Sequence, residues 1–170
     1  MLNPVRTKEV LDTFGKRVKQ QARTNLTKGK HNASGGLYDS TDYELSTGPE
    51  SFSFSFKLEE DYWEFQDKGV SGTEVKYNTP FSYKTKKPPA KVFEKWAKQK
   101  GIKPRAKNGQ FTTYKSFGFA VANSIFKKGI KPTKFFSKPF ENEFNKLPEN
   151  LVQAYALDVE NFIDFTLNRK

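Results

Sequence analysis

An acidic cluster in the first half of the chain holds the residues with the most potential for chemistry. Its members are Glu59, Glu60, Asp61, Glu64 and Asp67, followed directly by Lys68. If this stretch is helical, Glu60, Glu64 and Asp67 share one face and could bind a divalent cation, as in a metal-dependent nuclease. Nuclease centres of that kind place an acid and the Lys on a strand, with a second acid elsewhere. We therefore favour an acidic surface that faces a basic neighbour.

Other catalytic groups are scarce. The one histidine, His31, follows Lys30 in a stretch rich in Gly, Asn and Ser, and the chain has no cysteine. These counts exclude a metal site with two His or two Cys, and any Cys–His pair. Neither a G-x-S-x-G elbow nor a phosphate-binding P-loop occurs. The sequence predicts a protein that is not an enzyme, with no catalytic residue, metal or cofactor.

Charge is segregated along the 170 residues, which carry a net charge of +11. Residues 1–36 have a net charge of +6, 37–67 of −8, 68–140 of +16 and 141–170 of −3. A basic block suits nucleic acid, whereas opposite charges on one subunit suit assembly with successive neighbours. A solvated lysine surface is the simplest alternative.

The basic block also contains aromatic residues, a combination found in surfaces that stack bases and follow a phosphate backbone. Lysine predominates over arginine there, which disfavours base recognition and leaves sequence-independent nucleic-acid binding as the alternative function. The candidate basic surface consists of Lys84, Lys86, Lys87, Lys103, Arg105 and Lys107.

The elements that would position these groups begin with a helix over residues 4–28, whose apolar stripe recurs every three or four residues. That stripe comprises Leu11, Phe14, Val18, Ala22 and Leu26. A β-hairpin follows, with arms at 43–45 and 51–58, because Phe52, Phe54 and Phe56 alternate with serines. A short helix from about Glu60 to Gly69 comes next.

The second half reads as helices at about 90–100 and 113–128, after a loop with one short strand. Each of the two ends in a KGIKP segment, so Gly101 and Gly129 are predicted left-handed caps. The last helix runs from Pro148 to about Asn168, with Leu151, Tyr155, Val159 and Phe162 on its inner stripe.

The predicted fold is α+β: a small antiparallel sheet packed against long N- and C-terminal helices. We expect one domain, with its core in 1–69 and 130–170 and a basic, mainly helical insertion at about 70–129. No run of 18 apolar residues and no signal-like start occurs, so we expect a soluble protein made inside the cell, without membrane contact.

The segment TKFFSKPF, residues 133–140, fits none of these elements. It is too aromatic for a solvated linker, and its prolines disfavour a central strand. Two interpretations stay open: an extended arm that inserts its rings into a neighbour, or a segment that packs on its own core.

The order of features resembles that of the tail-completion, or neck, proteins of tailed bacteriophages. The matching stretches are ARTNLTKGKHNASGGLYDS, DYWEFQDKG, and IKPTKFFSKPFENEF before the last helix. The acid at Asp67 and the large basic middle depart from the family pattern.

This resemblance implies a structural virion protein at the head–tail junction, assembled in the host cytoplasm. It would be a subunit of a hexameric or dodecameric ring that joins the portal or connector to the tail, with non-specific contact to packaged DNA also allowed. The candidate interface residues are Phe52, Phe54, Phe56, Glu64, Asp67, Lys131, Pro132, Lys134, Phe135, Phe136, Pro139 and Phe140.

Overall fold

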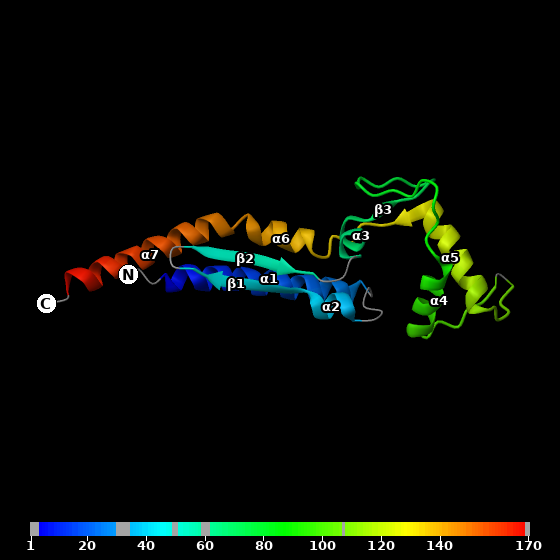
Figure 1. Ribbon diagram of the computed structural model, residues 1–170, viewed down its shortest axis with the longest axis horizontal. Helices are drawn as coiled ribbons and strands as arrows, with labels where there is room; N and C mark the ends of the chain where they lie inside the picture. The colour runs from blue at the N-terminus through cyan, green and yellow to red at the C-terminus, as the bar shows by residue number, and fades with distance from the viewer. Residues whose placement is uncertain (1–3, 30–34, 49–50, 59–61, 107, 169–170) are drawn as a thin grey trace. The chain divides into compact units, whose positions relative to one another are not determined.

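The computed structural model describes residues 4–29, 35–48, 51–58, 62–106 and 108–168 (Figure 1). The chain divides into two compact units: one of residues 1–26, 38–59 and 135–170, the other of 27–37 and 60–134, which contains the expected insertion. Long terminal helices and small antiparallel sheets confirm the α+β prediction. The elements are α1 (Val5–Lys28), α2 (Gly36–Ser40), β1 (Asp42–Thr47), β2 (Phe52–Lys57), α3 (Trp63–Lys68), β3 (Val70–Ser71), α4 (Ala90–Gln99), α5 (Tyr114–Lys128), β4 (Gly129–Ile130), α6 (Ser137–Phe144) and α7 (Leu147–Leu167).

In the first unit, α1 turns its predicted apolar stripe into the core. All five residues of the stripe are buried, and Val18, Ala22 and Leu26 are fully so. Polar and charged residues fill most of the opposite face, which is the pattern of a helix that packs along one side only. The predicted helix over residues 4–28 is confirmed, because α1 begins at Val5 and ends at Lys28.

The predicted hairpin is also present. Strands β1 and β2 pair antiparallel, with Tyr43 opposite Phe56 and Leu45 opposite Phe54. The rings of Phe54 and Phe56 lie 5.4 and 5.8 Å from the ring of Phe14 on α1. One face of the hairpin is therefore aromatic and packs on α1, while the serines between the phenylalanines are exposed.

The expectation of an extended arm at residues 133–140 is wrong. Helix α6 begins at Ser137, and Phe135 is 1% exposed, with its carbonyl accepting a hydrogen bond from Asn25 Nδ2 at 3.2 Å. The Phe140 ring lies 5.9 Å from that of Phe14. Pro139, the third residue of α6, is compatible with a helix because first-turn N–H groups have no partner within the helix.

In the second unit, α4 and α5 form an antiparallel helical hairpin. The ammonium of Lys98 lies 5.5 Å from the Tyr114 ring, and Lys87 donates a hydrogen bond to Asn123 at 2.7 Å. Between these contacts the helices approach closely at Gly118. A Cβ there would lie 2.7 Å from the carbonyl oxygen of Ala90, so glycine is required.

The two KGIKP segments differ, and the prediction of identical helix ends is wrong for the second. At the first, Gly101 has φ 64°, and Ile102 N–H donates to the carbonyl of Ala97 at 2.9 Å, which is a Schellman motif. At the second, Gly129 has φ 76° and ψ −167°, and it begins β4, which pairs with β3. Because a Cβ on Gly129 would lie 2.1 Å from the Val70 carbonyl oxygen, only glycine fits.

Candidate protein-interaction surface

Helix α7 is anchored to α1 by one buried carboxylate. Asp158 is 5% exposed and accepts three hydrogen bonds at the start of α1: from the N–H of Arg6 at 3.1 Å, the N–H of Thr7 at 2.9 Å and the hydroxyl of Thr7 at 2.8 Å. First-turn N–H groups lack partners within their own helix, so Asp158 satisfies them from a distant part of the sequence.

The electrostatics of this contact favour the charged carboxylate. Burial acts to raise the pKa of Asp158, but the hydrogen bonds from Thr7 and Arg6 outweigh it and hold that pKa below its ordinary value. The anchor therefore fixes which side of α7 faces α1, and with it which side is left outward.

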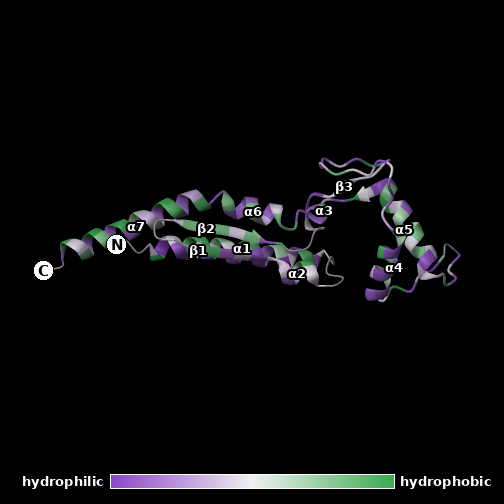
Figure 2. Ribbon diagram, viewed as in Figure 1, coloured by the Kyte–Doolittle hydropathy of each residue, from purple (hydrophilic) through white to green (hydrophobic). Residues whose placement is uncertain are grey.

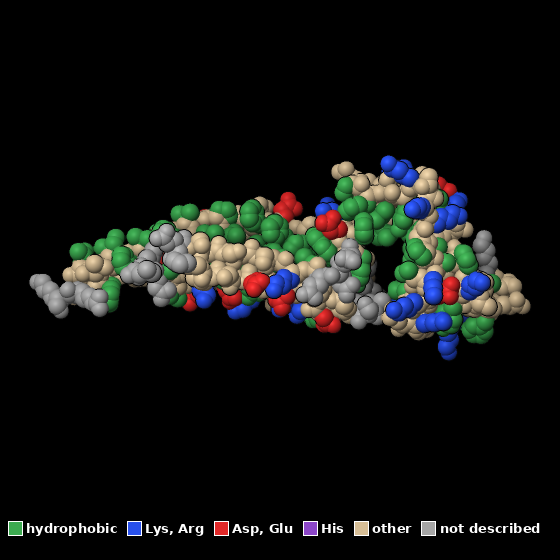
Figure 3. All heavy atoms as spheres, viewed as in Figure 1, with side chains coloured by type: hydrophobic (Ala, Val, Ile, Leu, Met, Phe, Trp, Pro, Cys, Tyr) green, Lys and Arg blue, Asp and Glu red, His purple; other side chains and the backbone are tan. Residues whose placement is uncertain are grey.

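The outward side of α7 is apolar. Of the large side chains there, Val152 is 70% exposed, Tyr155 52% and Ile163 48%. Figure 2 shows hydrophobic residues at intervals along the whole helix, and Figure 3 shows such side chains at the surface over α7. At ~100° per residue, five side chains share one face roughly 100° wide. We call this set the apolar face of α7: Val152, Tyr155, Val159, Phe162 and Ile163.

The charges that border this face have one sign. Glu149, Glu160 and Asp164 are exposed, and no Lys or Arg occurs from Leu147 to Leu167. A helix with an exposed apolar face and only acidic charges lacks the lysines that keep surface helices well solvated. Exposed apolar surfaces of this kind mark protein–protein interaction sites.

The seam between α1 and α7 is open to solvent on either side of the Asp158 contact. One hollow of about 460 Å³ has Val10, Phe14 and Ala154 in its walls, with Arg17 and Glu143 also lining it. A second, of about 600 Å³, lies beside Asp158 and is lined by Val5, Phe162 and Phe165 among others. The outer half of α7 is thus only loosely covered by its own unit.

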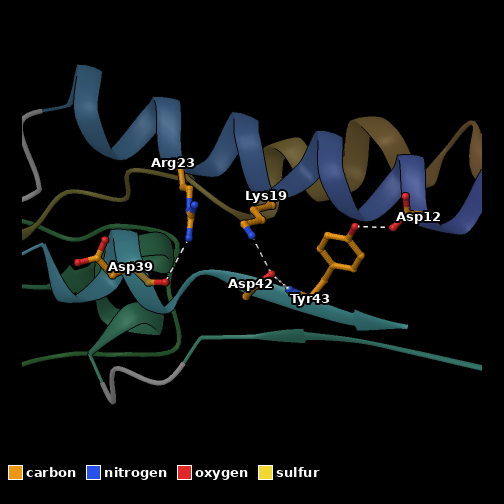
Figure 4. A network of polar contacts seen from close by, with 6 residues as sticks. All are labelled: Asp12, Lys19, Arg23, Asp39, Asp42 and Tyr43. Atoms are coloured by element: carbon orange, nitrogen blue, oxygen red, sulfur yellow. Dashed lines mark hydrogen bonds and ion pairs between the residues drawn. The ribbon is translucent and has the colours of Figure 1, made fainter. Parts of the chain in front are cut away.

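A network of titratable side chains joins α1 to residues 39–43, and Figure 4 shows it closely. The Tyr43 hydroxyl donates to Asp12 at 2.6 Å, Lys19 pairs with Asp42 at 2.9 Å, and Arg23 donates to the Asp39 carbonyl at 3.2 Å. Burial, with help from the Asp12 bond, raises the pKa of Tyr43 to about 12. A phenol held neutral beside a paired carboxylate suits a structural bond, because neither group is poised to titrate near neutral pH.

The predicted interface phenylalanines lie mostly inside their own unit. Phe56 contacts the rings of Phe136 and Phe140 at 5.1 and 5.9 Å. Phe135 and Pro139 are buried, whereas Phe52, Phe54, Phe56, Phe136 and Phe140 are half-buried. The structure thus gathers these rings into one cluster with Phe14, and that cluster is a core.

The remaining predicted interface residues are dispersed. Glu64 pairs with Lys68 at 3.4 Å within α3, and Asp67 is 1% exposed, with its carbonyl accepting from Lys134 N–H at 3.0 Å. Lys131 and Lys134 are exposed, and Pro132 packs against Gly69. Within the described ranges, no group of three or more His, Asp or Glu side chains could hold a metal ion.

The predicted basic surface lies in the second unit. Lys84, Lys86, Lys87 and Lys103 are exposed. The Arg105 guanidinium lies 4.3 Å from the ring centre of Phe111, which is 67% exposed. Lys107, like His31 and the acids at 59–61, falls outside the described residues.

Sequence reasoning missed the apolar face of α7. It placed a helix at the correct residues but turned Tyr155 and Phe162 inward, whereas both are exposed. The available signal was charge: a stripe bordered only by acids, on a chain with a large excess of lysine.

Comparison with protein-family models, with curated proteins and with solved structures finds no match to this chain. Among the described residues, no helix combines the length and apolar character needed to cross a bilayer.

Proposed function

We propose that this chain is a structural assembly protein that works as a ring subunit, of the kind that joins the portal or connector of a tailed bacteriophage to its tail. The observation that carries the proposal is the apolar face of α7, which the described part of its own unit leaves exposed. Burying one large apolar side chain contributes up to about 2 kcal/mol, so five on one face are a substantial driving force for association.

The composition of that face suits the centre of an interface. Tyr155 and Phe162 are aromatic residues, the class enriched where protein partners meet, and no charged residue interrupts the stripe. Asp158 holds α7 in a fixed rotation against α1. The face is therefore presented before any partner binds, which lowers the entropic cost of association.

Charge divides between the two compact units in a way that favours ordered assembly. The second unit contains nineteen Lys and Arg against six Asp and Glu, a net charge of +13, whereas the first has a net charge of −2. A ring with head-to-tail contacts needs two different, complementary patches on each subunit. The order of sequence motifs, which resembles that of phage neck proteins, supports the same conclusion.

Negative-stain electron microscopy tests this proposal. The purified chain is imaged alone and after incubation with the portal rings and tail tubes of the same virus. We expect closed rings, either free or seated on those particles. A chain that stays monomeric and leaves both particles bare would contradict the proposal.

One observation favours sequence-independent nucleic-acid binding as a second candidate. The second unit, with its net charge of +13, also exposes the ring of Phe111 beside Arg105. Filter binding of a DNA duplex at two salt concentrations tests it. Binding through phosphates predicts that log affinity falls with log salt by roughly 0.9 per contacted phosphate. Binding that is weak and flat with salt would rule out this role.

A further inference from the structure

Helix α4 carries an exposed apolar patch of its own. Val92 is 58% exposed and Trp96, one turn later on the same side, is 37% exposed. Lys91 and Lys95 are exposed along one edge of this pair. The single acid of α4, Glu94, lies instead against Gly118 of α5. We call Val92, Trp96, Lys91 and Lys95 the basic face of α4.

This face has the features that the apolar face of α7 lacks. On α7 the apolar stripe is bordered by Glu160 and Asp164, and on α4 the apolar pair is bordered by two lysines. Both surfaces are single helix faces, so ridges of one can enter grooves of the other. Trp and Tyr side chains on the two faces would supply the rigid aromatic contacts that dominate interface energies.

Other described helices fit α7 less well. The outward residues of α1 include many cations, but Val5 is its one large apolar side chain listed among the exposed ones at 47%, at its very start. Phe144 of α6 is exposed beside Glu141 and so repeats the acidic sign of α7. Two α7 helices would bring Glu160 and Asp164 of one copy toward those of another, and like charges at an interface cost several kcal/mol.

We propose that the apolar face of α7 in one copy binds the basic face of α4 in a second copy. The two faces differ, so the contact is head-to-tail, and each copy keeps one free face of each kind for the next neighbour. Repeated, this contact produces a ring when its rotation closes and a filament when it does not. The inference rests on the proposed function and deepens it by naming the partner surface.

Charge reversal in pairs tests this contact. The acidic-side variant is Glu160→Lys with Asp164→Lys, and the basic-side variant is Lys91→Glu with Lys95→Glu. Each alone should weaken self-association by about tenfold or more, measured by light scattering over a concentration series. Lys115→Glu, an exposed position on α5, is the matched control and should leave association unchanged. Circular dichroism confirms the fold of every variant.

Mixing the variants gives the sharpest result. Each variant keeps one intact face, so an equimolar mixture still has an α7 acidic face and an α4 basic face that fit. Each chain can form one such junction, and we expect a dimer of twice the 19.6 kDa chain mass and no larger species. Placing all four reversals in one chain should restore the larger assemblies, because the charges again complement each other.

Three outcomes would overturn the inference. The variants could keep the association of the unaltered chain, the mixture could fail to form the dimer, or the fourfold variant could stay monomeric. Its failure is separable from that of the proposed function. Rings that persist in both variants would refute the α7–α4 contact alone. Charge-sensitive oligomers that never engage portal or tail particles would refute the neck role alone.

Discussion

At the scale of single residues, Asp158 does the most to define the surface that the proposal needs. It caps the first turn of α1 from α7 with three hydrogen bonds, and its side chain is almost completely buried. Because the bonds go to a charged acceptor, each is stronger than one between neutral groups. The residue therefore couples the stability of unit one to the orientation of the apolar face.

Replacing Asp158 with Asn removes this charge while keeping the size of the side chain. We expect the free energy of unfolding to fall by about 1–3 kcal/mol, since hydrogen bonds to a charged group in a buried site are lost. Urea unfolding measures the change. Asp164→Asn, at an exposed position of the same helix, is the control and should have almost no effect. Equal losses in the two variants would contradict the role of Asp158.

The same group predicts a dependence on acid. Its folded pKa is lower than the ordinary value of an aspartate, so its contribution to stability is present above that ordinary value and is lost as pH falls through the folded pKa. We expect acid unfolding to be shallower in Asp158→Asn than in the unaltered chain over this window. Parallel acid unfolding curves for the two proteins would show that the carboxylate contributes nothing.

Tyr43 gives the corresponding prediction at alkaline pH. With its pKa raised to about 12, its contribution to stability is complete below about 10 and is lost as pH rises toward 12. Tyr43→Phe should lower the free energy of unfolding by about 0.5–1.5 kcal/mol at neutral pH and remove this alkaline loss. Tyr155→Phe, on the exposed face of α7, is the control. An unchanged alkaline loss in Tyr43→Phe would contradict the account.

At the scale of elements, the sequence predicted helices and strands well and their partners less well. The stripe on α1 was placed inward correctly because its opposite face is charged, which leaves one choice. Helix α7 was located equally well, but apolar periodicity does not say whether the covering partner belongs to the same chain. The segment before α6 was misread because Pro139 was taken as a helix breaker, although a first-turn proline is not one.

Phe135 provides the element-scale test of that correction. An arm that inserts into a neighbour would tolerate truncation in the isolated chain, whereas a ring buried under α1 would not. We expect Phe135→Ala to lower the free energy of unfolding by about 3–5 kcal/mol in thermal or urea unfolding. Phe111→Ala, at a 67% exposed position, should change it by less than about 0.5 kcal/mol. Comparable small losses would restore the extended arm.

Gly118 tests the α4–α5 hairpin that presents the basic face. Alanine normally favours a helix over glycine by about 1 kcal/mol, but here its Cβ would collide with the Ala90 carbonyl. We expect Gly118→Ala to separate the two helices and weaken self-association together with stability. Ser124→Ala, exposed on the same helix, should be neutral or slightly stabilising. A stabilised Gly118→Ala variant would mean that the helices are not in close contact.

At the scale of the whole molecule, charge and apolar surface are unevenly distributed. Nearly all of the excess positive charge belongs to the second unit, while the largest exposed apolar helix face belongs to the first. The block charges along the sequence indicated the first of these facts. The second required coordinates, because exposure depends on where α6 and α1 leave α7 uncovered.

The mass of the purified chain in solution, measured by light scattering over a concentration series, tests the central claim most directly. The comparison is between the unaltered chain and one with Tyr155→Ser and Phe162→Ser, with Phe111→Ser as the control for losing an exposed ring. We predict assemblies heavier than one 19.6 kDa chain for the unaltered and control proteins, and a monomer with unchanged melting for the double variant. An unaltered chain that stays monomeric throughout, with the same mass as the double variant, would contradict the claim that another copy covers α7.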